Sequence, residues 1–139
     1  MLGAYVMTQK DITTDVTKPD TIGMGSYQSD SHHVRRIPTP DGAVENEGEQ
    51  YVMPAPYQIP YRIMLPKAGA VTNLLVPVCF SASHVAYSTI RMEPQYMILG
   101  QAAGVAASIA VRNRIGVGQV PVQELQAKLR DHKAVLSLP

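Results

Sequence analysis

The chain has 139 residues, of which 45% are hydrophobic. These values are those of one ordinary globular domain and exclude a short peptide and a disordered tail. Twelve lysines and arginines against eleven aspartates and glutamates give a formal charge of +1. Because the basic residues are scattered along the chain, no basic patch indicates a nucleic-acid partner.

The chain contains one cysteine, Cys79, so an intrachain disulfide framework is excluded. Its four histidines lack the arrangement of a structural zinc site, and we predict no metal. The first ten residues lack a basic leader and a long apolar centre, so they do not indicate a signal peptide. Residues 94–111 are uncharged, but polar and small side chains dilute them too strongly for a membrane span.

In chain order, residues 1–20 begin with apolar residues at helical spacing and then become polar, which suits a helix end and a loop. Residues 21–27 alternate like a short strand, and their two glycines permit close approach to the backbone. Residues 37–60 combine an Asp-Gly pair with several prolines, which predicts a turn or hairpin followed by extended chain. We interpret this last stretch as a connector that covers a site.

The second half of the chain predicts two strands and two helices. Residues 61–65 are expected to form one strand and residues 73–78 another, buried on both faces because apolar residues follow one another there. Residues 94–112 predict a long helix with proline in its first turn. This helix is apolar nearly all round and is expected to be buried. Residues 121–132 predict an amphipathic helix that packs on the outside.

The long helix carries small residues in a row: Gly100, Ala103, Gly104 and Ala107 form a surface with almost no side chain. Such a surface lets another backbone or a flat ligand come close. Spacing alone favours tight packing against a sheet over a ligand, because small residues are common wherever elements approach closely.

The order of the predicted elements, in contrast, favours a ligand at this helix. A buried strand is followed by a loop that carries His84 and Arg91, and then by a helix whose amino end returns toward the strand's carboxyl end. Ligands of α/β proteins bind at such a place. The helix start offers unpaired N–H groups and partial positive charge, which favour an electron-rich oxygen near residues 91–95.

One long stretch resembles a known family. Residues 73–104, from Asn73-Leu-Leu-Val-Pro-Val to Gly100-Gln-Ala-Ala-Gly, are similar to the carboxyl-terminal flavin-contacting segment of the bacterial FAD-dependent oxidoreductase family, some members of which are labelled xanthan lyase-like. The resemblance continues upstream through Pro60-Tyr-Arg62 with Leu65-Pro-Lys67 and through Gly25-Ser-Tyr27, and covers roughly residues 22–130.

The resemblance implies an α/β fold, namely the C-terminal part of a two-part Rossmann-type FAD-binding flavoprotein. Residues 1–60 would be a partial substrate-side or cap-side region with a proline-rich connector, and residues 61–139 the last part of the FAD-binding domain. A glycine-rich turn for the FAD pyrophosphate is absent, because neither Gly23-Met-Gly25 nor Gly116-Val-Gly118 has a third glycine or a βαβ setting. The expected partner is therefore a missing N-terminal Rossmann portion, and this chain alone should bind FAD poorly.

The resemblance also implies which residues contact FAD: Pro77, Val78, Cys79, Arg91, Met92, Glu93 and Met97. The first three would run past the ribityl chain, and the residues before the helix would approach the pyrimidine edge, where a donor stabilises the negative charge of reduced flavin. A purely structural loop is the alternative. Cys79 lies between apolar neighbours, so we expect it to be buried and inert.

Three residues are candidates for catalysis or substrate contact. His84 can exchange a proton near neutral pH during hydride transfer, or it simply bonds a neighbouring loop. His32 follows close after Asp30 and is either an oriented base or part of a solvated turn. Arg62 either clamps a substrate carboxylate or forms a structural salt bridge.

Two functions remain open at this stage. In the first, the chain is the last portion of an FAD-dependent oxidoreductase that covers the flavin ring and helps to transfer hydride between FAD and an unidentified small organic substrate. In the second, it is an interaction module without cofactor that uses the small-residue helix and the proline-rich connector. No paired carboxylates support polysaccharide lyase chemistry.

Overall fold

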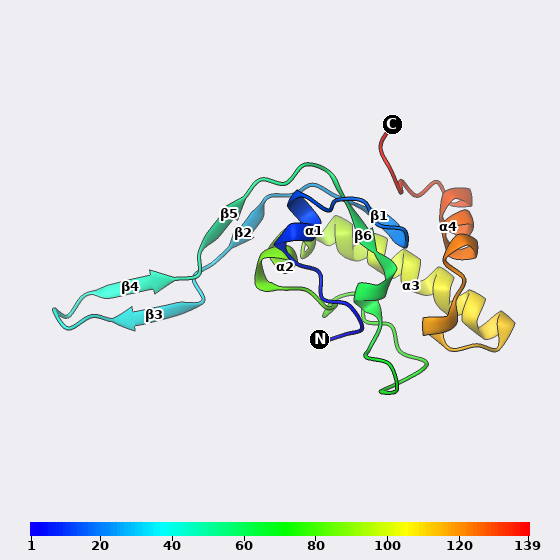
Figure 1. Ribbon diagram of the computed structural model, residues 1–139, viewed down its shortest axis with the longest axis horizontal. Helices are drawn as coiled ribbons and strands as arrows, with labels where there is room; N and C mark the ends of the chain where they lie inside the picture. Colours follow the sequence, from blue (N-terminus) through cyan, green and yellow to red (C-terminus); the bar gives the residue numbers. More distant parts are fainter.

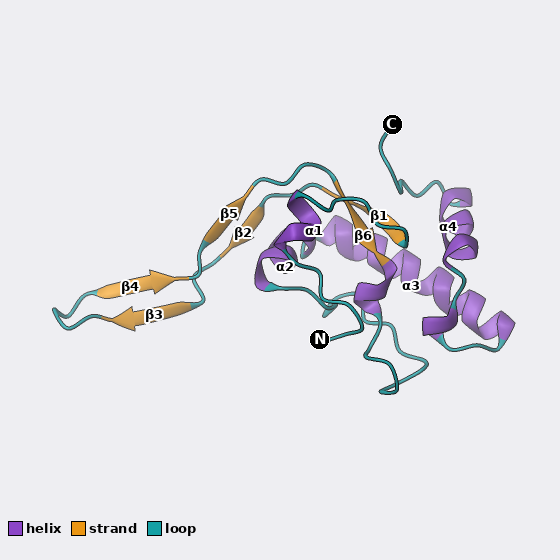
Figure 2. Ribbon diagram, viewed as in Figure 1, coloured by secondary structure: helices purple, strands orange, loops and turns teal.

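The computed structural model describes residues 1–49 and 51–139 in full and residue 50 by its backbone. Helices and strands are mixed along the chain (Figures 1 and 2). The helices are α1 (Gln9–Thr13), α2 (His84–Ile90), α3 (Glu93–Asn113) and α4 (Val122–Asp131), with 3-10 turns η1 (Tyr61–Met64) and η2 (Val117–Gln119). The strands are β1 (Thr21–Gly25), β2 (Ser29–Ser31), β3 (Arg35–Pro38), β4 (Val44–Glu47), β5 (Gln50–Val52) and β6 (Tyr57–Pro60).

The body of the molecule is built on the antiparallel pair β1–β6, which lies across α3 (Figure 1). Ile22 of β1 and Ile59 of β6 are buried and belong to the same core as the buried face of α3. A Cβ atom added at Gly23 would collide with the Ile98 side chain of α3. The strand can therefore approach the helix this closely only with glycine at position 23.

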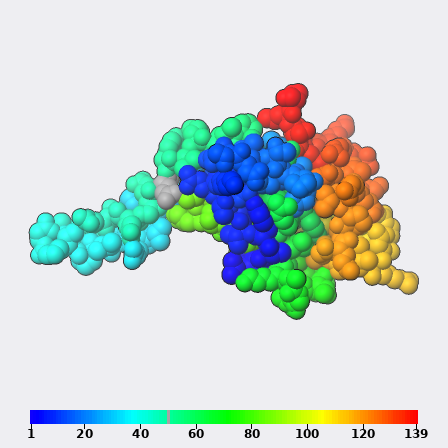
Figure 3. Space-filling view, in the orientation of Figure 1, coloured from blue at the N-terminus to red at the C-terminus, as the bar shows by residue number. Residues whose placement is uncertain are grey.

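The remaining strands form a β-ribbon that we call the arm, in which β2 pairs with β5 and β3 with β4. The arm extends away from the body (Figures 1 and 3), and every residue of β3 and β4 is exposed. Its tip turns at Gly42, whose φ of 83° suits glycine. The hairpin predicted within residues 37–60 is confirmed. Charged residues line both strands of the tip, which protects exposed edges from pairing with other chains: Arg35, Arg36, Glu45 and Glu47.

Both predicted helices form, as α3 and α4, but the expected burial of α3 all round is wrong. Its buried face consists of Leu99, Ala102, Ala106, Ile109 and Ala110. On the opposite side Met97 is 73% and Val111 79% exposed. A Cβ atom added at Gly100 or Gly104 would meet no described atom within 4 Å outside the helix. Within this chain, the small residues that bring the helix close to the sheet are therefore alanines, and the two glycines lie on an open face.

The two predicted strands of the second half are also wrong. Residues 61–65 begin with the 3-10 turn η1, because Asp20 holds its start: the Tyr61 N–H donates to the Asp20 carbonyl and the Arg62 N–H to the Asp20 carboxylate. Residues 73–78, all described, form no strand, and Leu74 and Val78 are exposed. Their apolar run predicts burial on both faces, but the described residues supply no neighbouring strand to pair with it.

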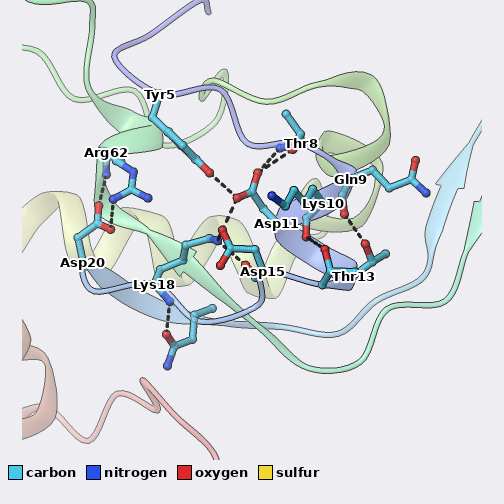
Figure 4. Close-up of polar contacts among 12 residues, drawn as sticks. Tyr5, Thr8, Gln9, Lys10, Asp11, Thr13, Asp15, Lys18, Asp20 and Arg62 are labelled. Atoms are coloured by element: carbon cyan, nitrogen blue, oxygen red, sulfur yellow. Dashed lines mark hydrogen bonds and ion pairs between the residues drawn. The ribbon is translucent and has the colours of Figure 1, made fainter.

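A buried ionic cluster anchors the first twenty residues (Figure 4). Lys18, whose side chain is 1% exposed, lies 3.0 Å from the Asp11 carboxylate and 2.9 Å from that of Asp15. Asp11 also accepts hydrogen bonds from the Tyr5 hydroxyl and from Thr8. Burial by itself raises the pKa of Asp11, but the hydrogen bonds from Tyr5, Thr8 and Lys18 outweigh it and lower that pKa from 3.8 to about 2.

We expect this cluster to give the protein an acid-sensitive stability. The folded-state pKa of Asp11 is depressed, so its contribution of about 2 kcal/mol is present above pH 4 and is lost as the pH falls toward 2. Asp11→Asn should remove this pH dependence and, because Lys18 keeps its buried charge, cost about 3 kcal/mol at neutral pH. Urea unfolding at several pH values measures both effects. Asp15→Asn is the control: its side chain is 57% exposed, and it should cost less than about 1 kcal/mol.

The glycines of α3 and β1 predict opposite effects of the same substitution. Gly100→Ala places a methyl group in open space on a helix, so it should raise the free energy of unfolding by about 0.5–1 kcal/mol. Gly23→Ala forces β1 away from Ile98 and should destabilise the chain by about 1–3 kcal/mol. Thermal unfolding of both variants checks the packing; destabilisation by Gly100→Ala would contradict the open face.

Candidate functional site

One face of α2 and the end of β2 line an open cavity of about 330 Å³ at the surface, which we call the α2–β2 cavity. His84, Tyr87, Ser88 and Arg91 line it from α2, at the spacing of a single helical face. The residues that line it from β2 and the chain beyond are Asp30, Ser31, His32, His33 and Val34. The structure therefore brings His32 together with His84 and Arg91, which lie more than fifty residues further along the chain.

The opposite face of α2 is fixed in the core. Val85, Ala86, Thr89 and Ile90 are buried. The Thr89 hydroxyl bonds the Tyr57 hydroxyl at 2.8 Å and also reaches the Tyr27 carbonyl. Burial raises the pKa of Tyr57 to about 12, so its hydroxyl stays protonated. Ser83 caps the helix by accepting from the Ala86 N–H. These contacts set the rotation of α2 and so aim His84 and Arg91 at β2.

Arg91 joins the two walls of the cavity. Its Nη2 donates to the Asp30 carbonyl oxygen at 2.9 Å and lies 3.8 Å from the Asp30 carboxylate. The Arg91 side chain is 34% exposed, so part of its guanidinium still faces the cavity opening. On the same rim, the Nδ1 of His33 lies 3.6 Å from the Glu49 carboxylate.

The residues expected to contact FAD lie around the start of α3. Tyr87 donates to the Val78 carbonyl at 3.4 Å, and its hydroxyl lies 2.9 Å from that of Tyr96 in the first turns of α3. The ring of Phe80 packs against Tyr87 with 5.0 Å between the centroids. These contacts tie the segment containing Pro77, Val78 and Cys79 to the helix that carries Met97.

The start of α3 has free backbone donors. Met92 is the residue before the first turn and gives no side-chain cap. Glu93 begins the helix, Pro94 has no N–H, and the Tyr96 N–H already bonds the Met92 carbonyl. The first turn of a 21-residue helix thus presents N–H groups and a positive dipole end close to Arg91.

Arg62 lies neither among the residues that line the α2–β2 cavity nor among those around the start of α3. Its Nη1 lies 2.8 Å from Asp20 Oδ1, and its guanidinium stacks on the Tyr5 ring at 4.2 Å (Figure 4). Arg62 Nε is buried and has no hydrogen-bond partner. The structure thus places Arg62 in a salt bridge, one of the two roles that the sequence left open, and away from the α2–β2 cavity.

Cys79 departs from expectation, because its side chain is exposed rather than buried. Tyr87 and Tyr96 are the residues that sequence reasoning missed at this site. Tyr87 could have been found from its spacing to His84 and Arg91 on one helical face. Burial, first, and then the hydrogen bond from Tyr87 raise the pKa of Tyr96 to about 12.

Neither a metal centre nor a membrane helix is found in the described part of the chain. Its His, Cys, Asp and Glu residues form no group of three that could hold a metal ion. No helix there combines the length and the apolar character needed to cross a bilayer.

Comparison with known proteins gives one family. The family model described as FAD dependent oxidoreductase matches residues 1–129. No curated protein and no solved structure matches the chain significantly.

The exposure of Cys79 predicts rapid labelling of the native protein. A disulfide reagent such as DTNB should modify the single thiol in native buffer at a rate close to that of an exposed thiol, without prior unfolding. The same reaction in urea provides the total thiol content. Labelling that occurs only in urea would show that Cys79 is buried.

Proposed function

This chain belongs to the family of FAD-dependent oxidoreductases, and on that premise we propose that it is the C-terminal portion of such an enzyme. In this proposal residues 61–139 complete a Rossmann-type FAD-binding domain and cover the flavin ring, while residues 1–60 stand on the substrate side. The observation that carries the proposal is the α2–β2 cavity, which is lined by three histidines and by Arg91, two residues before the start of α3. It supports a substrate pocket beside the flavin.

The residues around the start of α3 fit the ring end of FAD. Val78 and Met97 offer exposed apolar side chains, 48% and 73% exposed, that suit the faces of a flat aromatic ring. The free N–H groups of the first turn of α3 and the nearby Arg91 suit the electron-rich pyrimidine edge. We therefore propose that Pro77, Val78, Cys79, Arg91, Met92, Glu93 and Met97 form this contact.

The described residues do not fit the pyrophosphate end of FAD. A phosphate cradle needs glycines whose missing side chains leave room for the ligand. The space beside Gly23 is filled by Ile98 and that beside Gly25 by Tyr57, and in the second pair Gly118 is open but Gly116 faces Thr72, so neither close pair leaves room at both of its glycines. We propose that an N-terminal Rossmann portion supplies the cradle and covers the open Gly100 and Gly104 face of α3.

The proposed roles follow from the positions of the side chains. Bound FAD supplies the hydride acceptor or donor. His84 exchanges a proton with the substrate at an imidazole nitrogen, since it opens onto the α2–β2 cavity. His32 faces the same cavity from the β2 side and is the second candidate for that exchange. Arg62 is paired with Asp20, so we assign it to holding η1 in place rather than to the substrate.

A pair of substitutions tests the flavin contact in the full-length polypeptide that contains this chain. Met97→Lys would set an unpaired charge against the ring, so we expect FAD affinity to fall at least about tenfold. Val44→Lys, at the exposed tip of the arm, should leave it unchanged. FAD content is measured by visible absorbance, and bleaching by dithionite shows that the flavin is redox-active.

Two outcomes would contradict the proposal. Equal FAD content in the Met97→Lys and Val44→Lys proteins would remove the start of α3 from the flavin site. A colourless full-length protein that cannot be reconstituted with FAD would favour the interaction module instead.

A further inference from the structure

We propose that the α2–β2 cavity binds the carboxylate group of a small organic acid, with Arg91 as its anchor. The inference rests on the proposed function in that it names the substrate class of the same pocket. The binding of an acid is nevertheless a property of this chain alone, so it is measurable without FAD.

The charges that face the cavity favour a ligand with a single negative charge. Arg91 is the one permanent positive charge among the lining residues, and its Nη2 lies 3.8 Å from the Asp30 carboxylate, too far for a hydrogen bond, so the guanidinium can still take a second anionic partner. The carboxylates of Asp30 and of Glu49, which lies 3.6 Å from His33 on the rim, repel any further negative charge. The remaining titratable groups of the lining are His32, His33, His84 and Tyr87. A doubly charged phosphate would be left beside the Asp30 carboxylate with its charge only partly compensated.

The hydrogen-bonding groups of the cavity match a ligand rich in acceptors. The Ser88 hydroxyl already donates to the Val85 carbonyl at 2.8 Å, and the Tyr87 hydroxyl is engaged by Val78 and Tyr96. The donors left to a ligand are the remaining N–H groups of Arg91 and the imidazoles of His32 and His84. A carboxylate, with two oxygens in one plane, suits the planar guanidinium.

Arg91 is held in place before any ligand arrives. Its bond to the Asp30 carbonyl fixes one nitrogen, and its position at the end of α2 is fixed by the buried Thr89 and Ile90. A fixed guanidinium loses little side-chain entropy when an anion binds.

Propionate is the probe for this site, and its neutral isostere propionamide is the matched control ligand. Imidazole resonances of the 139-residue chain are followed by NMR during titration at constant ionic strength. We expect saturable shifts of His32 and His84 with propionate and none with propionamide. Arg91→Gln should weaken propionate binding about tenfold or more, whereas Arg36→Gln, an exposed arginine of the arm, should not.

Further measurements distinguish the proposal from competing explanations. His132, beside Lys128 and Arg112 in a different cavity, reports general attraction of anions to basic groups, and an equal shift there would overturn the proposal. Tighter binding of inorganic phosphate than of propionate, or no saturable shift, would overturn it as well. If Arg91→Gln fails to fold, Arg91→Lys keeps the charge but loses the planar fork, and undiminished affinity in that variant would contradict the anchor.

The proposal and the proposed function fail separately. Propionate binding without any flavin in the full-length protein would leave the acid site intact and remove the oxidoreductase role. A full-length protein that contains flavin but shows no propionate binding in the α2–β2 cavity would support the oxidoreductase role and contradict the acid site.

Discussion

The structure depends on the contact between one face of α3 and the β1–β6 pair. Ala102 and Ala106 are fully buried on that face, and Gly23 lets the strand come close enough to enclose them. The other face of the helix carries Gly100 and Gly104, beside which the space is open, and the largely exposed side chains of Met97 and Val111. An apolar helix face of this kind gains stability when a further layer covers it. The sequence of α3 therefore provides one face for the β1–β6 pair and a second apolar face that remains exposed.

This constraint explains which predictions from sequence succeeded. The ends of α3 carry local signals, a proline in the first turn and a left-handed residue, Arg114, after the last, and local signals place helix ends regardless of what the helix packs against. The β3–β4 hairpin likewise follows from its own turn. Burial and sheet formation depend on distant partners, and there the sequence misleads: residues 73–78 have the composition of a covered strand but no neighbour among the described residues.

In the candidate site, too, the local features could be predicted from the sequence, but the contacts between distant segments could not. The three cavity residues His32, His84 and Arg91 were each recognisable as polar groups near predicted element ends. Their convergence was not, because it requires β2 to pack on α2, and β2 is a three-residue strand without a periodic signal. Arg62 illustrates the converse: its residue type suits a substrate clamp, but only the three-dimensional structure shows that it lies outside the cavity lining and is bonded to Asp20 at 2.8 Å.

The α2–β2 cavity is formed entirely by residues of this chain. The inner face of α2 is fixed by the Thr89–Tyr57 hydrogen bond, and Arg91 is bonded to the Asp30 carbonyl, so the helix and the arginine are held in position by contacts within this chain. The side chains proposed to contact the flavin ring, those of Val78 and Met97, are exposed at the surface of this chain. Catalysis needs substrate and cofactor fixed relative to each other within a fraction of an ångström. Because Tyr87 lines the cavity and also bonds Tyr96 of α3, a flavin held at the start of α3, as proposed, would be positioned relative to the cavity through this contact.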